Sequence, residues 1–347
     1  MNRVTDREPR RFADYRKLLA LPDLKCVAVA TPDHWHALMT IEALAAGKHV
    51  YLEPPVCRTL AECRAMLHAE KQYGKVVQVA HMGRANAAAA AVMRFRKEGG
   101  LGPVGSVELW SNPGPDAPEC ATTEAAPSEL DWPMWLGPAA RMPYCRELFE
   151  GKWRNVPALT GGLYRERISA QFALLPWLTG IEMVGQWKAG PLGKATGDAR
   201  TQPQSLVFES MENTMSIMWQ FTEDKAHSLG WGMNLIVSKD SVWIAGGGTG
   251  CAAEIKVFKK RPETRPRDDF NPNHRGNWVN AFNGKDPVNM PLKTAAAGLA
   301  LAVAGQTAWQ LGREVVIDLD TLTMSDDEAQ EIEALEYAAP WKLPVGS

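Results

Sequence analysis

The 347-residue sequence lacks several features that would place it in a special class of protein. No run of about 18 apolar residues occurs, so no membrane span is predicted. The polar start, residues 1–11, has no apolar core of the kind that a secretory signal needs. The six cysteines form no C-x-x-C pair, and we interpret them as reduced thiols with neither a disulfide framework nor a metal site. These absences predict a cytoplasmic protein.

An excess of charge of one sign is also missing. The formal net charge is −2 and the positive residues are scattered, which argues against a nucleic-acid partner. What the chain does contain is an ordinary globular composition, 45% hydrophobic and 22% charged, with 13 tryptophans. Its length allows two domains, each with its own core.

The first third alternates short apolar runs with helical patterns. The expected strands are residues 26–30, 49–53, 76–80 and 104–110. A helix over 36–46 is expected to have Asp33 as its N-cap, and a capping box at Thr59–Glu62 opens a second helix that ends at Gly74. Strands and helices at a spacing of roughly 25 residues predict parallel strands joined by right-handed crossovers.

The later part of the chain has a different pattern of expected strands and helices. Residues 206–221 and 228–244 show strand-like alternation, and 292–311 predicts a helix whose Gly298 and Gly305 allow close packing. The predicted fold class is α/β. Residues 1–105 are expected to form a truncated Rossmann-like parallel sheet. Residues 106–347 are expected to form an α+β domain with a large, open, mostly antiparallel sheet, and a tail from about residue 325 to pack back on the first domain.

Several separated motifs resemble those of one known family. Residues 30–37, A-T-P-D-H-W-H-A, resemble the A-T-P-x-x-x-H signature of the Gfo/Idh/MocA family (glucose–fructose oxidoreductase and inositol dehydrogenase-like). Residues 46–53 resemble the segment leading into that family's E-K-P, and residues 77–84 its next strand and the arginine after it. Residues 131–138, D-W-P-M-W-L-G-P, resemble a run found in one branch of the family.

The resemblance implies a fold, a reaction and partners. It implies a nucleotide-binding domain and a second domain whose open sheet mediates a homo-oligomer or a hetero-complex. It also implies hydride exchange between NAD or NADP and a sugar or polyol. The implied acid/base equipment is the lysine of E-K-P with a histidine and an aspartate on one helix of the second domain.

Three departures from that family shape our functional hypothesis. No glycine precedes Gly47, so the family's G-x-G-x-x-G turn is missing and the NAD(P) site is expected to be degenerate. The lysine position is Pro54, and counting from Trp177 the histidine and aspartate positions are Ala170 and Ala173. None of these three side chains can carry a proton. We therefore expect a protein that lacks the parent chemistry and serves as a sugar-binding or partner subunit.

An active enzyme is the alternative. It would be an NAD(P)-dependent sugar oxidoreductase if the true start lies upstream, or a hydrolase or lyase that uses a reshaped cleft. Candidate catalytic residues are Tyr164, Glu166 and His81, and candidate substrate-binding residues are Arg165, Arg167 and Gln171. The resemblance implies a cofactor-binding role for Thr31, Pro32, His34, Trp35, His36, Glu53, Pro55 and Arg84.

Each of these groups also has a structural interpretation. The histidines after the first strand are equally consistent with helix capping and packing, and residues 164–171 with a solvated helix start followed by a core stripe. The glycine-rich run 246–250 follows a strand but precedes no helical pattern, so we expect a hairpin or bulge rather than a phosphate loop.

Overall fold

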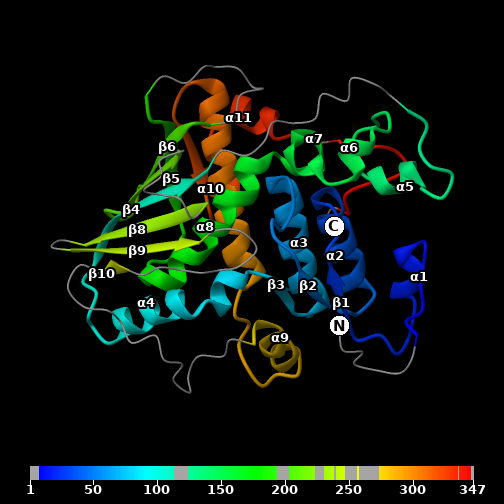
Figure 1. The fold of residues 1–347 in the computed structure, drawn as a ribbon, viewed down its shortest axis with the longest axis horizontal. Coiled ribbons are helices and arrows are strands. Elements are labelled where there is room, and N and C mark those ends of the chain that lie inside the picture. Colours follow the sequence, from blue (N-terminus) through cyan, green and yellow to red (C-terminus); the bar gives the residue numbers. More distant parts are fainter. Residues whose placement is uncertain are drawn as a thin grey trace.

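The computed structural model is described over residues 8–112, 124–193, 203–222, 230–237, 240–246, 256–257, 273–334 and 336–344. It contains two sheets with two long helices, α8 (Leu163–Thr179) and α10 (Leu292–Leu311), between them (Figure 1). The run at 247–250 of the glycine-rich segment lies outside the described residues.

The first sheet, sheet A, has three parallel strands in the order β1 (Cys26–Val29), β2 (His49–Leu52) and β3 (Val77–Val79). It confirms the predicted parallel arrangement. Helices α2 (His36–Ala45) and α3 (Leu60–Tyr73) connect these strands. α3 begins at the predicted capping box, since the side chains of Thr59 and Glu62 each accept a hydrogen bond from the other residue's backbone N–H. The helix ends at Gly74, which has a φ of 58°.

One local prediction about this sheet was wrong. Asp33 does not cap α2, because the 3-10 turn η1 (Asp33–Trp35) comes first and Trp35 occupies the N-cap position of α2. The cause is local: Pro32 starts the turn one residue before Asp33, which places the aspartate inside a helical turn instead of in front of it.

The second sheet, sheet B, has nine strands among the described residues. In spatial order they are β10 (Lys256–Val257), β9 (Asp240–Gly246), β8 (Trp231–Val237), β4 (Val104–Ser111), β7 (Ser216–Phe221), β6 (Ser205–Ser210), β5 (Gln186–Pro191), β11 (Val315–Asp318) and β12 (Thr323–Met324). Only the β4–β7 pair is parallel within this order. The predicted large, mostly antiparallel sheet is therefore confirmed.

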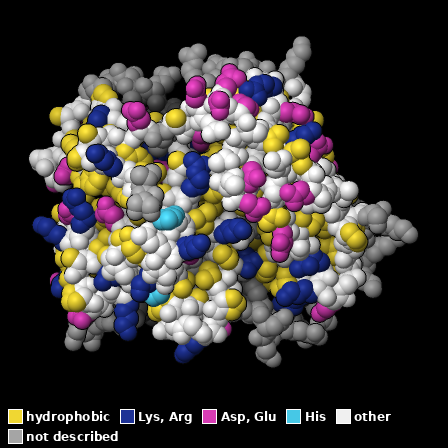
Figure 2. Space-filling view, turned by 180° about the vertical axis from the view of Figure 1, so that it is seen from behind, with side chains coloured by type: hydrophobic (Ala, Val, Ile, Leu, Met, Phe, Trp, Pro, Cys, Tyr) yellow, Lys and Arg dark blue, Asp and Glu magenta, His cyan; other side chains and the backbone are white. Residues whose placement is uncertain are grey.

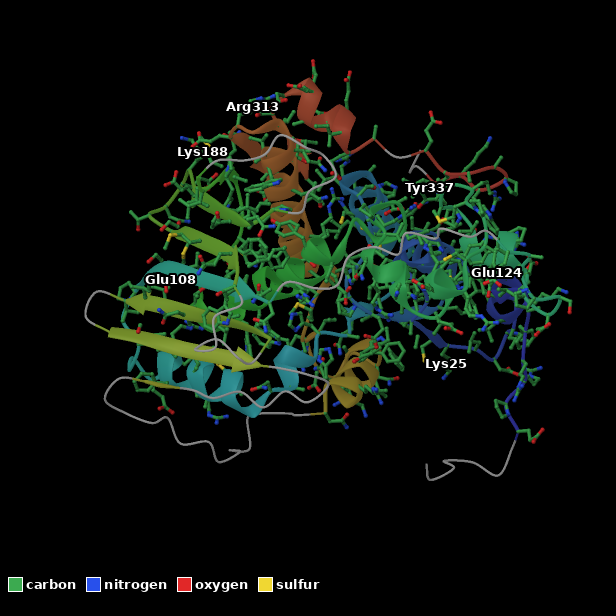
Figure 3. All side chains as sticks on the ribbon, turned by 45° about the horizontal axis from the view of Figure 1, so that its top comes forward. Lys25, Glu108, Glu124, Lys188, Arg313 and Tyr337 are labelled. Atoms are coloured by element: carbon green, nitrogen blue, oxygen red, sulfur yellow. The ribbon has the colours of Figure 1, made fainter. Side chains whose placement is uncertain are left out.

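Sheet B buries one face and exposes the other. Val107 and Leu109 on β4 are buried, whereas Glu108 between them points to the outward face, as does Lys188 on β5 (Figure 3). The buried face packs on α8 and α10. This alternation is what a sheet covered by helices on one side requires.

The two central helices pack unusually closely because α10 has glycine at the contact. A Cβ on Gly298 would lie 2.7 Å from the Ser169 carbonyl oxygen and 2.8 Å from the Ala173 nitrogen of α8. A Cβ on Gly305 would lie 2.6 Å from the Tyr164 hydroxyl. All three distances are too short for a real side chain, so the predicted close packing is confirmed.

The remaining helical elements cover the ends of the two sheets. They are α1 (Tyr15–Leu19), η2 (Met82–Ala85), α4 (Ala87–Lys97), α5 (Trp132–Leu136), α6 (Arg146–Phe149), η3 (Lys152–Asn155), α7 (Pro157–Thr160), α9 (His274–Phe282) and α11 (Asp327–Ile332). After α11 the chain returns to the helices of the first sheet (Figure 1), where Tyr337 donates to Glu62 at 2.8 Å and Trp341 packs on Trp35.

The cysteines only partly follow the sequence-based interpretation. Cys26, Cys57 and Cys63 are free thiols, as predicted. Cys145 is disulfide-bonded, so the prediction of no disulfide was wrong there. The residue spacing gives no signal for this bond, because the chain separation between paired cysteines is not constrained by sequence alone.

The surface carries both signs of charge. Lysine, arginine, aspartate and glutamate side chains are interspersed on the face shown in Figure 2. Within the ranges that the structure describes, no helix has the combination of length and apolar character needed to cross a membrane.

Candidate functional site

A cavity of about 390 Å³ lies where the loop after β3 meets α8 and the start of β8. We call it the cleft. Its lining residues are His81, Glu166, Arg167, Ala170, Gln171, Leu174, Gly230 and Trp231. Four residues singled out from the sequence, namely His81, Glu166, Arg167 and Gln171, therefore meet in one place. Their proposed roles in binding or catalysis stay predictions.

Helix periodicity explains why α8 supplies most of the lining. Glu166 and Ala170 are separated by four residues, as are Arg167 and Gln171, so each pair lies on the same side of the helix. The Gln171 amide nitrogen donates to the Trp110 and Gly232 carbonyls at 2.9 and 3.1 Å, which fixes α8 to the adjoining strands β4 and β8. Its buried amide oxygen has no partner among the described residues.

Glu166 is the carboxylate of the cleft. One of its oxygens, Oε2, is buried without a hydrogen-bond partner in the described part of the chain. Burial raises the pKa of Glu166, against the opposing charges of Arg154 and Arg167. The adjoining Arg167 guanidinium donates to the Asn112 carbonyl, which orients it along the cleft.

Asp33 is a second buried carboxyl group, whose pKa is affected by the charge of Glu166, and sequence reasoning missed it as a site residue. It is 5% exposed at the carboxyl end of β1, and its Oδ2 has no partner among the described residues. Burial, followed by the negative charge of Glu166, raises the pKa of Asp33 to about 8, although Arg154 and Arg58 act in the opposite direction. The available signal was its place directly after a strand end, where open α/β sheets bind ligands.

The replacement Asp33→Asn is expected to stabilise the protein more at pH 8 than at pH 5. An unfolded aspartate releases its proton near its ordinary pKa of 3.8, whereas folded Asp33 keeps it up to about 8. Between these two pKa values the unfolded state binds fewer protons than the folded state. The free energy of unfolding of the wild type therefore falls as pH rises, by about 1.4 kcal/mol per pH unit. Asparagine does not titrate. Thermal unfolding of both proteins at the two pH values tests this, and a difference in Tm that is independent of pH would refute it.

His81 connects the loop after β3 to α8. It is buried, and its Nε2 donates to the Ala170 carbonyl at 2.6 Å, while Nδ1 has no partner in the described residues. Burial lowers the pKa of His81, so the ring is neutral near pH 7. Residues 83 and 84 also pack against α8. Gly83 lies against Leu174, and the Arg84 guanidinium stacks 4.5 Å above the Trp177 ring. The segment 81–84 thus packs on α8 beside Ala170.

Two other candidates, Tyr164 and Arg165, lie outside the cleft. Tyr164 is 1% exposed and packs edge-on against Trp219 of sheet B at 4.8 Å. Arg165 forms a buried ion pair with Glu333 and donates to the Gln306 side chain and the Arg58 carbonyl. Neither side chain is available to a ligand in the cleft.

Most residues with an implied cofactor role are occupied by contacts within the protein. His34 Nε2 and Trp35 Nε1 both contact the Trp135 carbonyl, at 2.9 and 3.0 Å. His36 is enclosed between the Pro55 and Thr31 carbonyls, and burial lowers its pKa. Through these contacts the three residues stabilise the start of α2.

The groups that remain for a dinucleotide are few. Thr31 keeps a buried hydroxyl without a partner among the described residues, and Glu53 is half-buried with its pKa raised by burial. Pro32 and Pro55 have only backbone carbonyls, which already contact the Trp35 backbone nitrogen and the His36 ring, and Arg84 faces a different cavity. The described residues therefore do not make a recognisable NAD(P) site.

Comparison with known proteins adds a family match at the N-terminus. Residues 4–81 match the Gfo/Idh/MocA model, described as an oxidoreductase family with an NAD-binding Rossmann fold. Levoglucosan dehydrogenase from Pseudarthrobacter phenanthrenivorans is 39% identical over 90 residues, which cover 26% of this chain and 23% of that protein. A glycosyl hydrolase family 109 protein from Shewanella sp. (strain W3-18-1) is 45% identical over 49 residues, or 14% and 11% of the two chains. The matched stretch thus spans less than a quarter of either relative.

Solved structures extend the likeness to most of the chain. The aldose-aldose oxidoreductase from Caulobacter crescentus superimposes with a TM-score of 0.58 at 19% identity, covering 87% of this chain and 82% of that one. The WlbA dehydrogenase from Bordetella pertussis, solved with NADH and UDP-GlcNAcA, gives 0.62 at 19% identity, with 89% and 84% covered. At this identity the likeness establishes the two-domain fold.

Proposed function

Because the chain belongs to the Gfo/Idh/MocA oxidoreductase family by its N-terminal sequence and its fold, we propose that its cleft binds a sugar or polyol without the hydride transfer of that family. The observation that carries this proposal is the lining of the cleft. Trp231 offers an apolar ring, and Glu166, Arg167 and Gln171 offer polar groups around it. A polyhydroxylated ligand needs both kinds of surface, and about 390 Å³ is enough room for a small one.

The absence of proton-carrying side chains at three positions of the family pattern supports the second half of the proposal. Pro54, Ala170 and Ala173 stand at the positions that carry lysine, histidine and aspartate in the family pattern. General acid–base catalysis requires a titratable group within hydrogen-bond reach of the reacting atom. His81 does not replace them as a general acid, because the one proton of its neutral ring is on Nε2 and is donated to the Ala170 carbonyl.

A second candidate function rests on Glu166. With Ala170 at the histidine position of D-x-G-x-H-x-x-D, Glu166 stands at the first aspartate position. Its raised pKa, and the effect of its negative charge on the pKa of Asp33, are features of carboxyl pairs that exchange protons with a substrate. We therefore also propose, as an alternative to binding alone, that the cleft performs acid–base chemistry on the bound sugar, of a kind that needs no redox cofactor.

Calorimetric titration with neutral aldoses and polyols tests the binding proposal. We expect binding by the wild type near one site per chain, weakened about tenfold by Glu166→Gln, because a hydrogen bond to a charged group contributes about 1.5–3 kcal/mol. The exposed Glu150→Gln is the matched control and should bind as the wild type does. Absence of binding by every sugar would refute the proposal. Conversion of the sugar without any cofactor, lost in Glu166→Gln, would favour the second candidate.

A further inference from the structure

A second cavity, of about 530 Å³, lies beyond the other end of α8. It is lined by the last turns of α8, residues 181–184, residues 288–291 and the first turn of α10. It shares no lining residue with the cleft. Most of its wall is apolar, including Pro176, Trp177, Ile181, Met183 and Pro291.

Arg84 is a partly buried positive side chain in this mostly apolar wall. Its guanidinium stacks 4.5 Å above the Trp177 ring, which holds its position. In the part of the chain that the structure describes, no carboxylate forms an ion pair with Arg84. Burial lowers the pKa of Arg84 to about 10, and no neighbouring acid counteracts this effect.

A partly buried cation without a counter-charge is unfavourable, because stacking on one aromatic ring does not replace an opposite charge. The other charged residues of the wall do not supply that partner. Glu182 is exposed and makes no ion pair with Arg84. Lys293 has the wrong sign, is 68% exposed, and lies 3.8 Å from Asp320. The missing negative charge must therefore come from outside the described residues.

We propose that this cavity binds a small organic carboxylate. The planar guanidinium of Arg84 would hold the carboxylate through paired N–H···O bonds, and the apolar wall would enclose the hydrocarbon part of the ligand. Inorganic phosphate would satisfy the charge but leave the apolar wall uncovered. A volume of about 530 Å³ lies within the range of small-molecule sites.

The site is independent of sugar binding. Because the two cavities share no lining residue, failure of the sugar proposal leaves this one standing, and the reverse also holds. Ala173, which replaces an acid of the family pattern, lines the Arg84 cavity. An aspartate there would offer Arg84 an internal counter-charge, whereas alanine leaves the guanidinium for a ligand.

The test compares an acid with its neutral analogue. Wild-type protein is titrated by calorimetry with benzoate, with benzyl alcohol and with inorganic phosphate. We expect benzoate to bind at least tenfold more tightly than either of the others, with weaker binding at high salt. Arg84→Gln should weaken benzoate binding at least tenfold, and Arg84→Lys by less. Arg313→Gln, which removes an exposed arginine already paired with Asp326 and Glu328, should leave it unchanged.

Three results would overturn the proposal. Benzyl alcohol that binds as tightly as benzoate would remove the need for a negative charge. Phosphate that binds more tightly than benzoate would point to a bare anion site instead of an organic carboxylate site. Undiminished benzoate binding by Arg84→Gln would move the site elsewhere. The acid-to-alcohol comparison on the wild type decides the matter even if Arg84→Gln fails to fold.

Discussion

Replacement of Arg165 by methionine is expected to lower the free energy of unfolding by about 3–5 kcal/mol, a typical cost for removing one partner of a buried ion pair. Arg165 and Glu333 have side-chain exposures of 8% and 7%, and Arg165 also donates to Gln306 and to the Arg58 carbonyl. Without the guanidinium, the Glu333 carboxylate remains buried and unpaired. Guanidinium chloride unfolding at pH 7 measures the loss.

Two further variants separate charge from packing at this site. Arg165→Met combined with Glu333→Gln should recover part of the stability, because the uncompensated charge is gone. Lys152→Met is the control, since Lys152 and Glu147 are about half exposed and such pairs contribute little. If Arg165→Met unfolds like the control but loses sugar binding, Arg165 is a ligand-binding group after all.

Replacement of Ala170 by tryptophan is expected to abolish sugar binding, with an affinity loss of at least a hundredfold, while the protein stays folded. Ala170 is half-buried and its Cβ lies on the wall of the cleft, so an indole there fills the space that the sugar needs. The cost in helix propensity is only about 0.5 kcal/mol. Calorimetry measures the affinity, and far-ultraviolet circular dichroism checks the fold.

Ala170→Ser is the matched variant for that experiment. Its small side chain leaves the cleft open, so it should bind sugar as the wild type does. Unchanged affinity in Ala170→Trp would show that sugar binds somewhere other than this cleft.

The first sheet could be predicted from sequence because its signals are local. Each strand is a short apolar run, and the capping box at Thr59–Glu62 and the C-terminal Gly74 delimit α3 within a few residues of chain. The prediction of Asp33 as the N-cap of α2 failed, because a neighbouring residue changes the local structure. Pro32 begins η1 and thereby removes Asp33 from the N-cap position of α2.

The site could be predicted only in part because helix faces are fixed by distant contacts. The sequence suggested site roles for the polar residues between Tyr164 and Gln171. In the structure, α8 places these residues on different sides of the helix. Glu166, Arg167 and Gln171 line the cleft, whereas Tyr164 faces Trp219 and Arg165 faces Glu333. Those two partners follow 55 and 168 residues later in the chain, so no local pattern reveals them.

The second cavity had no sequence signal at all. Its wall combines Arg84, the end of α8 and the segment before α10, which come together only in the folded chain. Arg84 was noticed as part of a family motif, but its lack of a counter-charge is a property of three-dimensional packing. The burial of Asp33 beside Glu166 is a second example of the same limit.

The measurement that tests the central claim most directly is a two-signal titration of the wild-type chain. A sugar that binds is added in the presence of NAD+ or NADP+, and calorimetric heat and absorbance at 340 nm are followed on matched samples. We predict saturable heat from the sugar and no rise in absorbance. A sugar-dependent rise at 340 nm that persists over many turnovers would contradict the account, because it would show hydride transfer with Pro54, Ala170 and Ala173 in place.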